Sequence, residues 1–276
     1  MNLYKLSAFT LDPSGGNPAG VWVGDSLPND SDMQKIAHEV GYSETAFIAP
    51  SSDDGFVVRY FSPEMEVPFC GHATIASGVQ LGKLYGAGEY LLQTQAGIVP
   101  VMVNQANDEW TAALTSVATQ QKEIDEETLS SFLDLLNWHK DDLGTSIAPS
   151  FAYAGAWHLI LSVHDRQRLA HLEYDFAGLK DKMDEFELIT LQLVFRESDS
   201  VFHSRNPFPV GGVIEDPATG AAAAALGGYL RDAGIVQTPA EITIHQGHDM
   251  GRPSLLQVSI PESGGIVVAG TAVELN

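Results

Sequence analysis

The sequence predicts an α+β protein with two similar domains. Short alternating apolar segments typical of strands recur along the whole chain, and two helices of one kind lie about half a chain apart. Each of these helices begins at a glycine, Gly71 or Gly220, and continues with small apolar residues. Residues 221–226 are apolar on every side of the second helix, so we expect it to be buried inside a strongly curved sheet. Short connections favour mostly antiparallel or mixed strand pairing.

In the first half, period-two alternation of apolar residues predicts the strands, and helix-start chemistry predicts two helices. One helix follows an acidic cap at 30–32 and ends at Gly41, and the other runs from Gly71 to about Leu84. The expected strands are 3–9, 45–49, 56–61, 90–94, 99–103 and 110–114.

The second half repeats this arrangement. We expect helices near 126–137 and 219–232. The polar stretch 115–121 contains few large apolar residues and suits an interdomain connection, so we place the domain boundary after residue 116. The expected strands are 157–163, 188–195, 241–245, 255–260 and 266–273.

Charge and composition exclude several partners. The chain of 276 residues carries 14 Lys and Arg against 36 Asp and Glu, a formal charge of −22. Such a surface repels nucleic acid and anionic membranes, so we expect neither as a partner. The single cysteine, Cys70, excludes an intramolecular disulfide and a four-cysteine zinc site. Because no signal peptide or membrane-spanning run is recognisable, we expect a cytoplasmic protein.

Two segments of the first half could carry chemistry. Asn17, in the Gly/Pro-rich loop 15–20, offers a donor and acceptors for substrate, although an ordinary turn would also explain the loop. Glu44 stands at the start of an apolar strand. A solvated strand end is the plain interpretation, but burial there would raise the pKa of the carboxyl group and prepare it for general acid/base work.

Two further segments join a loop to a helix. At 69–74, the backbone amides near Gly71 and Ala73 could bind an anion, and His72 could exchange protons or merely cap the helix. At 211–221, Asp216 followed by proline fits a helix N-cap with proline at the first helical position. The amides of Gly220 and Ala221 could bind the same anion from the other domain, so we expect the site in the cleft between the domains.

Signals for metals and cofactors are weak. His245 and His248 have metal-ligand spacing but lie on a strand-to-loop segment, so we interpret them as non-metal residues. With no cluster of credible ligand spacing, we expect no metal. The sequence contains neither a dinucleotide-binding nor a phosphate-binding glycine motif, nor the nucleophile elbow of a hydrolase. We expect no cofactor.

Five segments in order resemble the motifs of the phenazine-biosynthesis PhzF-like family. They are spread over nearly the whole chain, which makes the set specific although each is weak alone. They read GGNPAGV (15–21), SETAF (43–47), FCGHAT (69–74), GGVIEDPATGAA (211–222) and MGRPS (250–254).

This resemblance implies a diaminopimelate-epimerase-like fold of two half-barrel domains, each a sheet around a central helix. The N-terminal domain would be 1–116, completed by the strand 265–276, and the C-terminal domain 117–264. It also implies a biosynthetic homodimer that isomerises trans-2,3-dihydro-3-hydroxyanthranilate without cofactor, by removing and returning a proton on one face of a small carboxylate. The family's catalytic residues would fall on Glu44, His72 and Asp216.

One departure concerns the substrate. The family often has a serine where this chain has Ala221, so a hydroxyl that could bind substrate is missing while the backbone amide remains. Two alternatives stay open. An amino-acid racemase or epimerase would share the fold, but the two-base type uses a pair of cysteines and this chain has one. A non-catalytic small-molecule-binding relative would keep the fold without turnover.

Overall fold

A computed structural model describes residues 2–52 and 55–275, and divides the chain into two compact units. The first comprises residues 1–115 and 269–276, and the second residues 116–268. In the described residues, no helix is long and apolar enough to cross a membrane.

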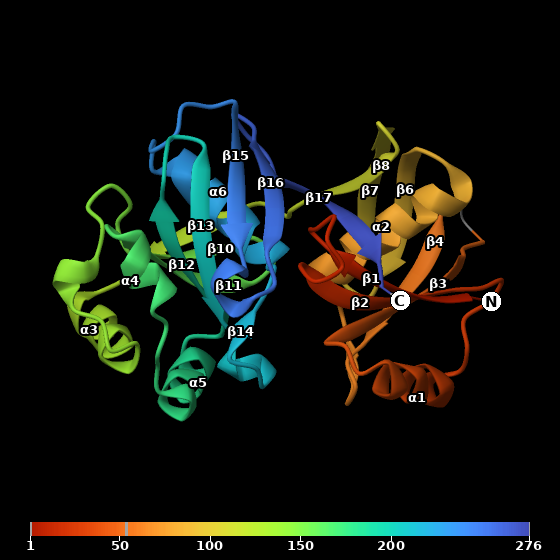
Figure 1. Cartoon of the computed structure of the whole chain (residues 1–276), viewed down its shortest axis with the longest axis horizontal. Coiled ribbons are helices and arrows are strands. Elements are labelled where there is room, and N and C mark those ends of the chain that lie inside the picture. The colour runs from red at the N-terminus through yellow and green to blue at the C-terminus, as the bar shows by residue number, and fades with distance from the viewer. Residues whose placement is uncertain (1, 53–54, 276) are drawn as a thin grey trace. The chain divides into compact units, whose positions relative to one another are not determined.

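The first unit is a closed ring of strands around one helix (Figure 1). The strand order around the ring is β1–β2–β3–β4–β6–β7–β8–β17, and β17 pairs with β1 to close it. The pairs β2–β3 and β4–β6 are parallel. Antiparallel pairing joins β1–β2, β3–β4, β6–β7, β7–β8 and β17–β1. The strands are β1 (Asn2–Ala8), β2 (Asn17–Val23), β3 (Glu44–Pro50), β4 (Phe56–Phe61), β5 (Glu66–Val67), β6 (Gly88–Thr94), β7 (Gly97–Ala106), β8 (Glu109–Thr115) and β17 (Val267–Glu274). The helices are α1 (Asp30–Val40) and α2 (Gly71–Tyr85).

The central helix α2 is buried from residue 72 to residue 82. It packs against β1, β2, β3, β7 and β8. Two glycines allow this close approach: a Cβ on Gly78 would lie 2.7 Å from a methyl of Val101, and one on Gly82 would lie 2.5 Å from a methyl of Val103. Small residues on this helix therefore follow from the limited space inside the ring.

The second unit is a mixed sheet with helices on both faces. Its strand order is β9–β10–β11–β12–β13–β15–β16, with parallel pairs at β11–β12 and β13–β15. The strands are β9 (Gln120–Glu123), β10 (Ser150–Tyr153), β11 (Trp157–Val163), β12 (Leu188–Arg196), β13 (Val201–Pro207), β14 (Glu215–Asp216), β15 (Ala240–Gln246) and β16 (Ser254–Ile260). The α-helices are α3 (Glu126–Leu135), α4 (Arg166–Ala170), α5 (Phe176–Glu185) and α6 (Gly220–Asp232), and the 3-10 turns are η1 (Lys140–Asp142), η2 (Pro209–Gly211) and η3 (His248–Met250).

The helix α6 is the counterpart of α2 and contacts β9, β10, β11, β12 and β16. Its residues 222–230 are all buried. The other face of the sheet packs against α3, α4 and α5 in an apolar core that includes Phe132, Leu161, Leu179 and Leu193. Alternate residues of β11 and β12 therefore belong to two different cores.

The predicted α+β class and the sheets around central helices are confirmed. The predicted strands and long helices are present, with ends that differ by a few residues. Corrections concern the segments between them. Residues 17–20, expected in the loop 15–20, belong to the strand β2, so Asn17 begins a strand. The polar residues 120–123 form β9, and β10, β13 and α5 were not predicted.

Candidate active site

In the first unit, two predicted residues meet beside the start of α2. Glu44 is the first residue of β3, which pairs parallel with β2. His72 is the second residue of α2, after Gly71 and the N-cap residue Cys70, whose side chain makes no capping hydrogen bond. The start of α2 thus places a thiol and an imidazole next to the carboxylate at the start of β3.

The contacts among these side chains are short. The Cys70 thiol donates to Glu44 Oε2 over 3.3 Å, and His72 Nε2 lies 3.5 Å from the same oxygen. Cys70 Sγ lies 3.4 Å from His72 Nδ1, and Ser43 Oγ lies 3.3 Å from His72 Nε2. Both contacts of the carboxylate fall on Oε2, and Oε1 has no hydrogen-bond partner among the described residues.

The three side chains of this cluster are buried or partly buried, unlike those of a surface ion pair. Cys70 and His72 are 8% and 7% exposed, whereas the Glu44 side chain keeps 19% of its surface. A partly buried carboxylate that contacts a thiol and an imidazole can exchange a proton with either neighbour, and its remaining exposure lets a small molecule reach it. The arrangement is suited to general acid/base chemistry.

The first turn of α2 also offers backbone amides. Gly71 begins the helix and Ala73 is the third residue. A Cβ placed on Gly71 would meet no atom within 4 Å, so there is space beside this helix start. The other expected binding residue of this unit, Asn17, is 2% exposed at the start of β2, opposite Ala8.

In the second unit, Asp216 does not cap α6, so that expectation was wrong. It lies in β14, the helix begins at Gly220, and the N-cap position is Thr219. Instead, Asp216 Oδ2 accepts a 2.6 Å hydrogen bond from Thr219 Oγ1. Gly220 and Ala221 are the first two residues of α6.

A buried glutamine fixes this segment. Gln246, 1% exposed on β15, donates to the Asp216 carbonyl over 2.8 Å and to Thr219 Oγ1 over 3.0 Å. Its own oxygen accepts from the Thr219 amide over 3.1 Å. The loop between β14 and α6 is therefore held at both ends by one side chain.

An ion pair anchors the neighbouring residue of β14. Arg205 binds Glu215 through two contacts of 3.0 and 2.5 Å, and a third nitrogen of the guanidinium donates to the Ala170 carbonyl over 2.7 Å. The side chains of Arg205 and Glu215 are 9% and 3% exposed. Because Asp216 is the next residue, this pair also sets the position of Asp216.

Sequence reasoning missed several of these residues. Cys70 was used only to exclude a disulfide and a four-cysteine zinc site, and Ser43, Thr219 and Gln246 had no assigned role. Ser43 and Thr219 lie inside the SETAF and EDPATG segments, which was the available signal. Gln246 lies 30 residues from Asp216, and nothing in its local sequence shows that contact.

The fold brings together potential metal ligands that the sequence spacing did not indicate. Ligand atoms of Glu44, Cys70 and His72 all lie within 4.8 Å of one another. By contrast, His245 and His248 do not enter any such group among the described residues. Their rings are 5.4 Å apart, and burial lowers the pKa of both.

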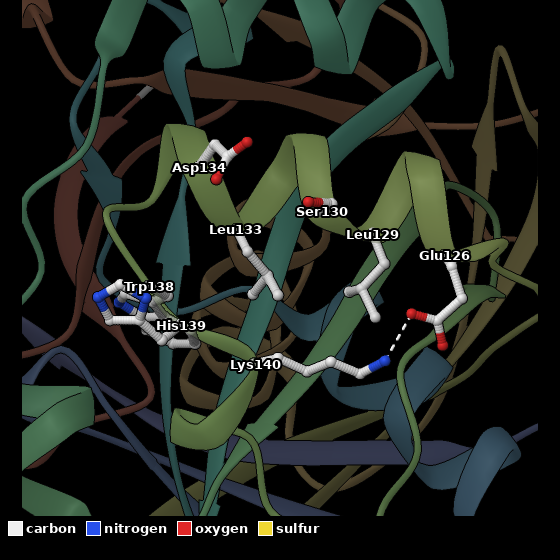
Figure 2. A pocket seen from close by; sticks show the side chains of 8 residues that line it. All are labelled: Glu126, Leu129, Ser130, Leu133, Asp134, Trp138, His139 and Lys140. Carbon is white, nitrogen blue, oxygen red and sulfur yellow. Dashed lines mark hydrogen bonds and ion pairs between the residues drawn. The ribbon is translucent and has the colours of Figure 1, made fainter.

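A surface hollow elsewhere contains none of the predicted site residues. It has a volume of about 230 Å³ and lies between α3 and the segment that follows it (Figure 2). The Lys140 ammonium contacts the Glu126 carboxylate across it, as the dashed line shows. The ammonium is thus paired with a carboxylate, and Asp134 adds a further negative charge to the lining.

Known structures of low sequence identity share this fold. A hydroxyproline epimerase from Agrobacterium vitis aligns over 99% of this chain and 89% of its own, with a TM-score of 0.66 and 12% identity. The PhzF-family phenazine biosynthesis protein from Bacillus anthracis aligns over 100% of this chain and 98% of its own, with a TM-score of 0.87 and 25% identity. The fold is therefore that of the diaminopimelate-epimerase-like isomerases and epimerases.

Sequence comparison identifies the family. The protein described as uncharacterized isomerase YfhB from Bacillus subtilis is 32% identical over 98% of this chain and 94% of its own. Uncharacterized isomerase YddE from Escherichia coli K12 is 30% identical over 99% of this chain and 96% of its own. The family profile PhzC-PhzF, phenazine biosynthesis-like protein, matches residues 6–276. The chain belongs to this family of isomerases.

Proposed function

We propose that this protein is a cofactor-independent isomerase that moves a proton on a small carboxylate, with Glu44 as the principal proton carrier. The observation that carries the proposal is the Glu44 carboxylate itself. It is partly buried, contacts two proton-bearing side chains through Oε2, and has Oε1 without a partner among the described residues. An oxygen in that position is suited to take a proton from a bound molecule.

The proposed reaction needs one base. Glu44 Oε1 accepts a proton from a carbon next to an electron-withdrawing group, the electron pair shifts to form a new double bond, and the resulting carboxylic acid returns the proton to another carbon on the same face. The Cys70 thiol hydrogen-bonds to Glu44 Oε2, and His72 can exchange the proton held by Glu44 for a solvent proton while the intermediate is bound. Atoms and charge balance without an oxidant or a metal.

Substrate binding uses helix starts. A carboxylate of the substrate would accept hydrogen bonds from amides at a helix start, where the helix dipole favours negative charge. Gly71 and Ala73 offer these amides in the first unit and Gly220 and Ala221 in the second. In a chain of charge −22, such local positive potential is what lets an anion bind at all.

Asp216 completes the proposed catalytic set by electrostatics and positioning. Its Oδ2 is held by Thr219 and its backbone by Gln246, so the carboxylate has a defined direction. We assign it to a positively charged or hydroxyl group of the substrate. Asn17 would contribute a further polar contact from β2. Because Ala221 carries no hydroxyl, the substrate should depend on the amide at this position alone.

Solvent deuterium exchange tests the reaction class. The purified protein is incubated in D₂O with a panel of cyclic and amino-substituted carboxylates that includes trans-2,3-dihydro-3-hydroxyanthranilate, and products are examined by NMR and mass spectrometry. An isomerase gives a rearranged product with at most one new deuterium at the accepting carbon. Binding of a panel member with no exchange or rearrangement would favour a non-catalytic relative, and inversion at an α-carbon would favour an amino-acid epimerase.

The proposal also covers the oligomeric state and the cellular location of the protein. We propose a cytoplasmic homodimer without nucleic acid or membrane partners, in keeping with the strongly acidic composition. Light scattering coupled to size exclusion should give twice the chain mass of 29.7 kDa. A mass equal to a single chain at micromolar concentration would remove the dimer from the proposal.

A further inference from the structure

The cluster at the start of α2 has the composition of a zinc site. It combines a thiol, an imidazole and a carboxylate, and these are the three side-chain types that bind Zn²⁺. Cys70 is the only cysteine of the chain, and the fold places it against Glu44, 26 residues away. Two groups from the N-terminal end of α2 and one from β3 therefore converge without any sequence motif for metal binding.

The distances also fit a metal. Glu44 Oε2, Cys70 Sγ and His72 Nε2 form a triangle with sides of 3.3, 3.5 and 3.9 Å. Tetrahedral zinc with bonds of about 2.0 to 2.3 Å separates its ligand atoms by roughly 3.3 to 3.8 Å. A cation could therefore contact all three atoms with little movement of the side chains.

Charge and access favour the same occupant. The thiolate and the carboxylate would neutralise the two charges of the cation, and the chain as a whole carries −22. Cys70 and His72 are more than nine-tenths buried, while the Glu44 side chain remains 19% exposed and leaves a path for entry. Three protein ligands leave a fourth position for water or a substrate carboxylate.

We propose that Glu44, Cys70 and His72 form a reversible, inhibitory binding site for Zn²⁺ or a similar borderline-soft divalent cation. On binding, a bond forms between the metal and Cys70 Sγ while the S–H proton leaves to solvent, and Glu44 and His72 coordinate through Oε2 and a ring nitrogen. The metal-bound carboxylate is then a poor base. The inhibitory part of this proposal rests on the proposed role of Glu44 as proton carrier, whereas the binding part does not.

Cobalt binding tests the site without any substrate. Tag-free, full-length protein is treated with chelator, freed of it, and titrated with Co²⁺, and the thiolate-to-cobalt charge-transfer absorption is followed. The wild type should saturate at one equivalent, and Zn²⁺ should displace the cobalt. Zinc calorimetry should show about one proton released per metal and an affinity that rises with pH, because the thiol must ionise.

Matched variants locate the ligands. Cys70→Ser should abolish the charge-transfer band, and both it and His72→Gln should weaken zinc by at least about 10- to 100-fold, the cost of disturbing even an outer-shell partner. The double variant His245→Gln/His248→Gln removes the pair with metal-ligand spacing in the sequence and should bind like wild type. Melting curves of metal-free proteins show whether each variant is folded.

The outcomes are distinct. No band in wild type, a band that survives Cys70→Ser, or binding lost in the folded double histidine variant would overturn the site. Once a substrate is identified, zinc should suppress turnover at the occupancy measured by binding, and chelator should restore it. Stoichiometric binding with unchanged turnover, or turnover that requires zinc, would overturn the inhibitory role. If no substrate is found, the binding experiment still decides whether the site exists.

Discussion

Glu215→Gln tests whether the Arg205 ion pair holds the second unit together next to Asp216. The substitution keeps the shape of the side chain but removes the negative charge that faces Arg205 over two contacts of 3.0 and 2.5 Å. With the partner side chains 9% and 3% exposed, the guanidinium would be left buried without a negative charge beside it, facing only neutral acceptors. Breaking a buried pair by removing one partner costs about 3 to 5 kcal/mol.

We expect a loss at the lower end, about 3 kcal/mol, because the Ala170 contact remains and the glutamine oxygen can still accept one hydrogen bond. For a unit of this size that corresponds to a fall in melting temperature of roughly 6 to 12 °C. The assay is urea unfolding of wild type and variant followed by tryptophan fluorescence, with the slope compared to confirm that both unfold the same surface.

Glu126→Gln is the matched control. Glu126 contacts Lys140 (Figure 2) over 2.5 Å, as short as the closer Arg205 contact. The side chains of Glu126 and Lys140 are, however, 81% and 67% exposed. Exposed pairs contribute about 0 to 1 kcal/mol because water screens them, so this variant should unfold close to wild type. If Glu215→Gln changed stability no more than Glu126→Gln, the reasoning from burial would be refuted.

Three further predictions concern single side chains. Thr219→Val removes the hydroxyl that donates to Asp216 and should cost about 1 to 2 kcal/mol and lower kcat, with Thr219→Ser restoring both; equal effects of the two variants would contradict this. Cys70→Ala should lower turnover by no more than about tenfold, the value of one hydrogen bond to Glu44, and a loss of about 10³-fold in folded protein would indicate thiol chemistry. Burial lowers the pKa of His158 from 6.5 to about 4. As the pH falls, this histidine therefore takes up a proton in the unfolded chain before it does so in the folded protein. The free energy of unfolding should fall by up to about 3 kcal/mol between pH 6.5 and pH 4. Urea unfolding at a series of pH values should show a smaller decline for His158→Leu than for wild type. If the free energies of unfolding of the two proteins declined in parallel with pH, this prediction would be contradicted.

The elements that sequence reasoning predicted are those whose own residues carry the signal. The strand β11 alternates between two apolar cores, and α2 and α6 consist of small apolar residues that only a buried helix would tolerate. The helix α1 ends at Gly41 in the left-handed conformation, as a glycine after the last periodic residue indicates. Local chemistry alone decides such features.

The elements that were missed depend on partners far away in the chain. The strand β13 contains buried Ser204, Arg205 and Asn206, which no apolar pattern would predict. Two of the three are paired with other strands: Arg205 binds Glu215, and the Asn206 side-chain nitrogen donates to Gln192 over 2.6 Å. Periodicity reports burial of apolar residues and is blind to polar residues buried with a partner.

The candidate site shows the same division. Glu44, His72 and Asp216 were predicted from short motifs, and the structure places Glu44 beside His72. The helix-cap interpretation of Asp216 failed because Thr219 occupies the N-cap position before Gly220, while a side chain from β15, Gln246, holds the loop that contains Asp216. The contact of Cys70 with Glu44 arises because α2 packs against β3 inside the ring. Nothing in the sequence next to either residue indicates this contact.

The central claim is that Glu44 carries the proton, and Glu44→Gln tests it most directly. The amide keeps the shape and hydrogen-bonding capacity of the side chain but has no basic oxygen. With an identified substrate, we predict that the dissociation constant changes little while kcat falls by about 10³- to 10⁴-fold or more, the upper range for general acid/base catalysis, and that deuterium incorporation from D₂O disappears with it. A folded Glu44→Gln protein that turns over within about tenfold of wild type would contradict the account and assign the proton transfer to His72 or Asp216.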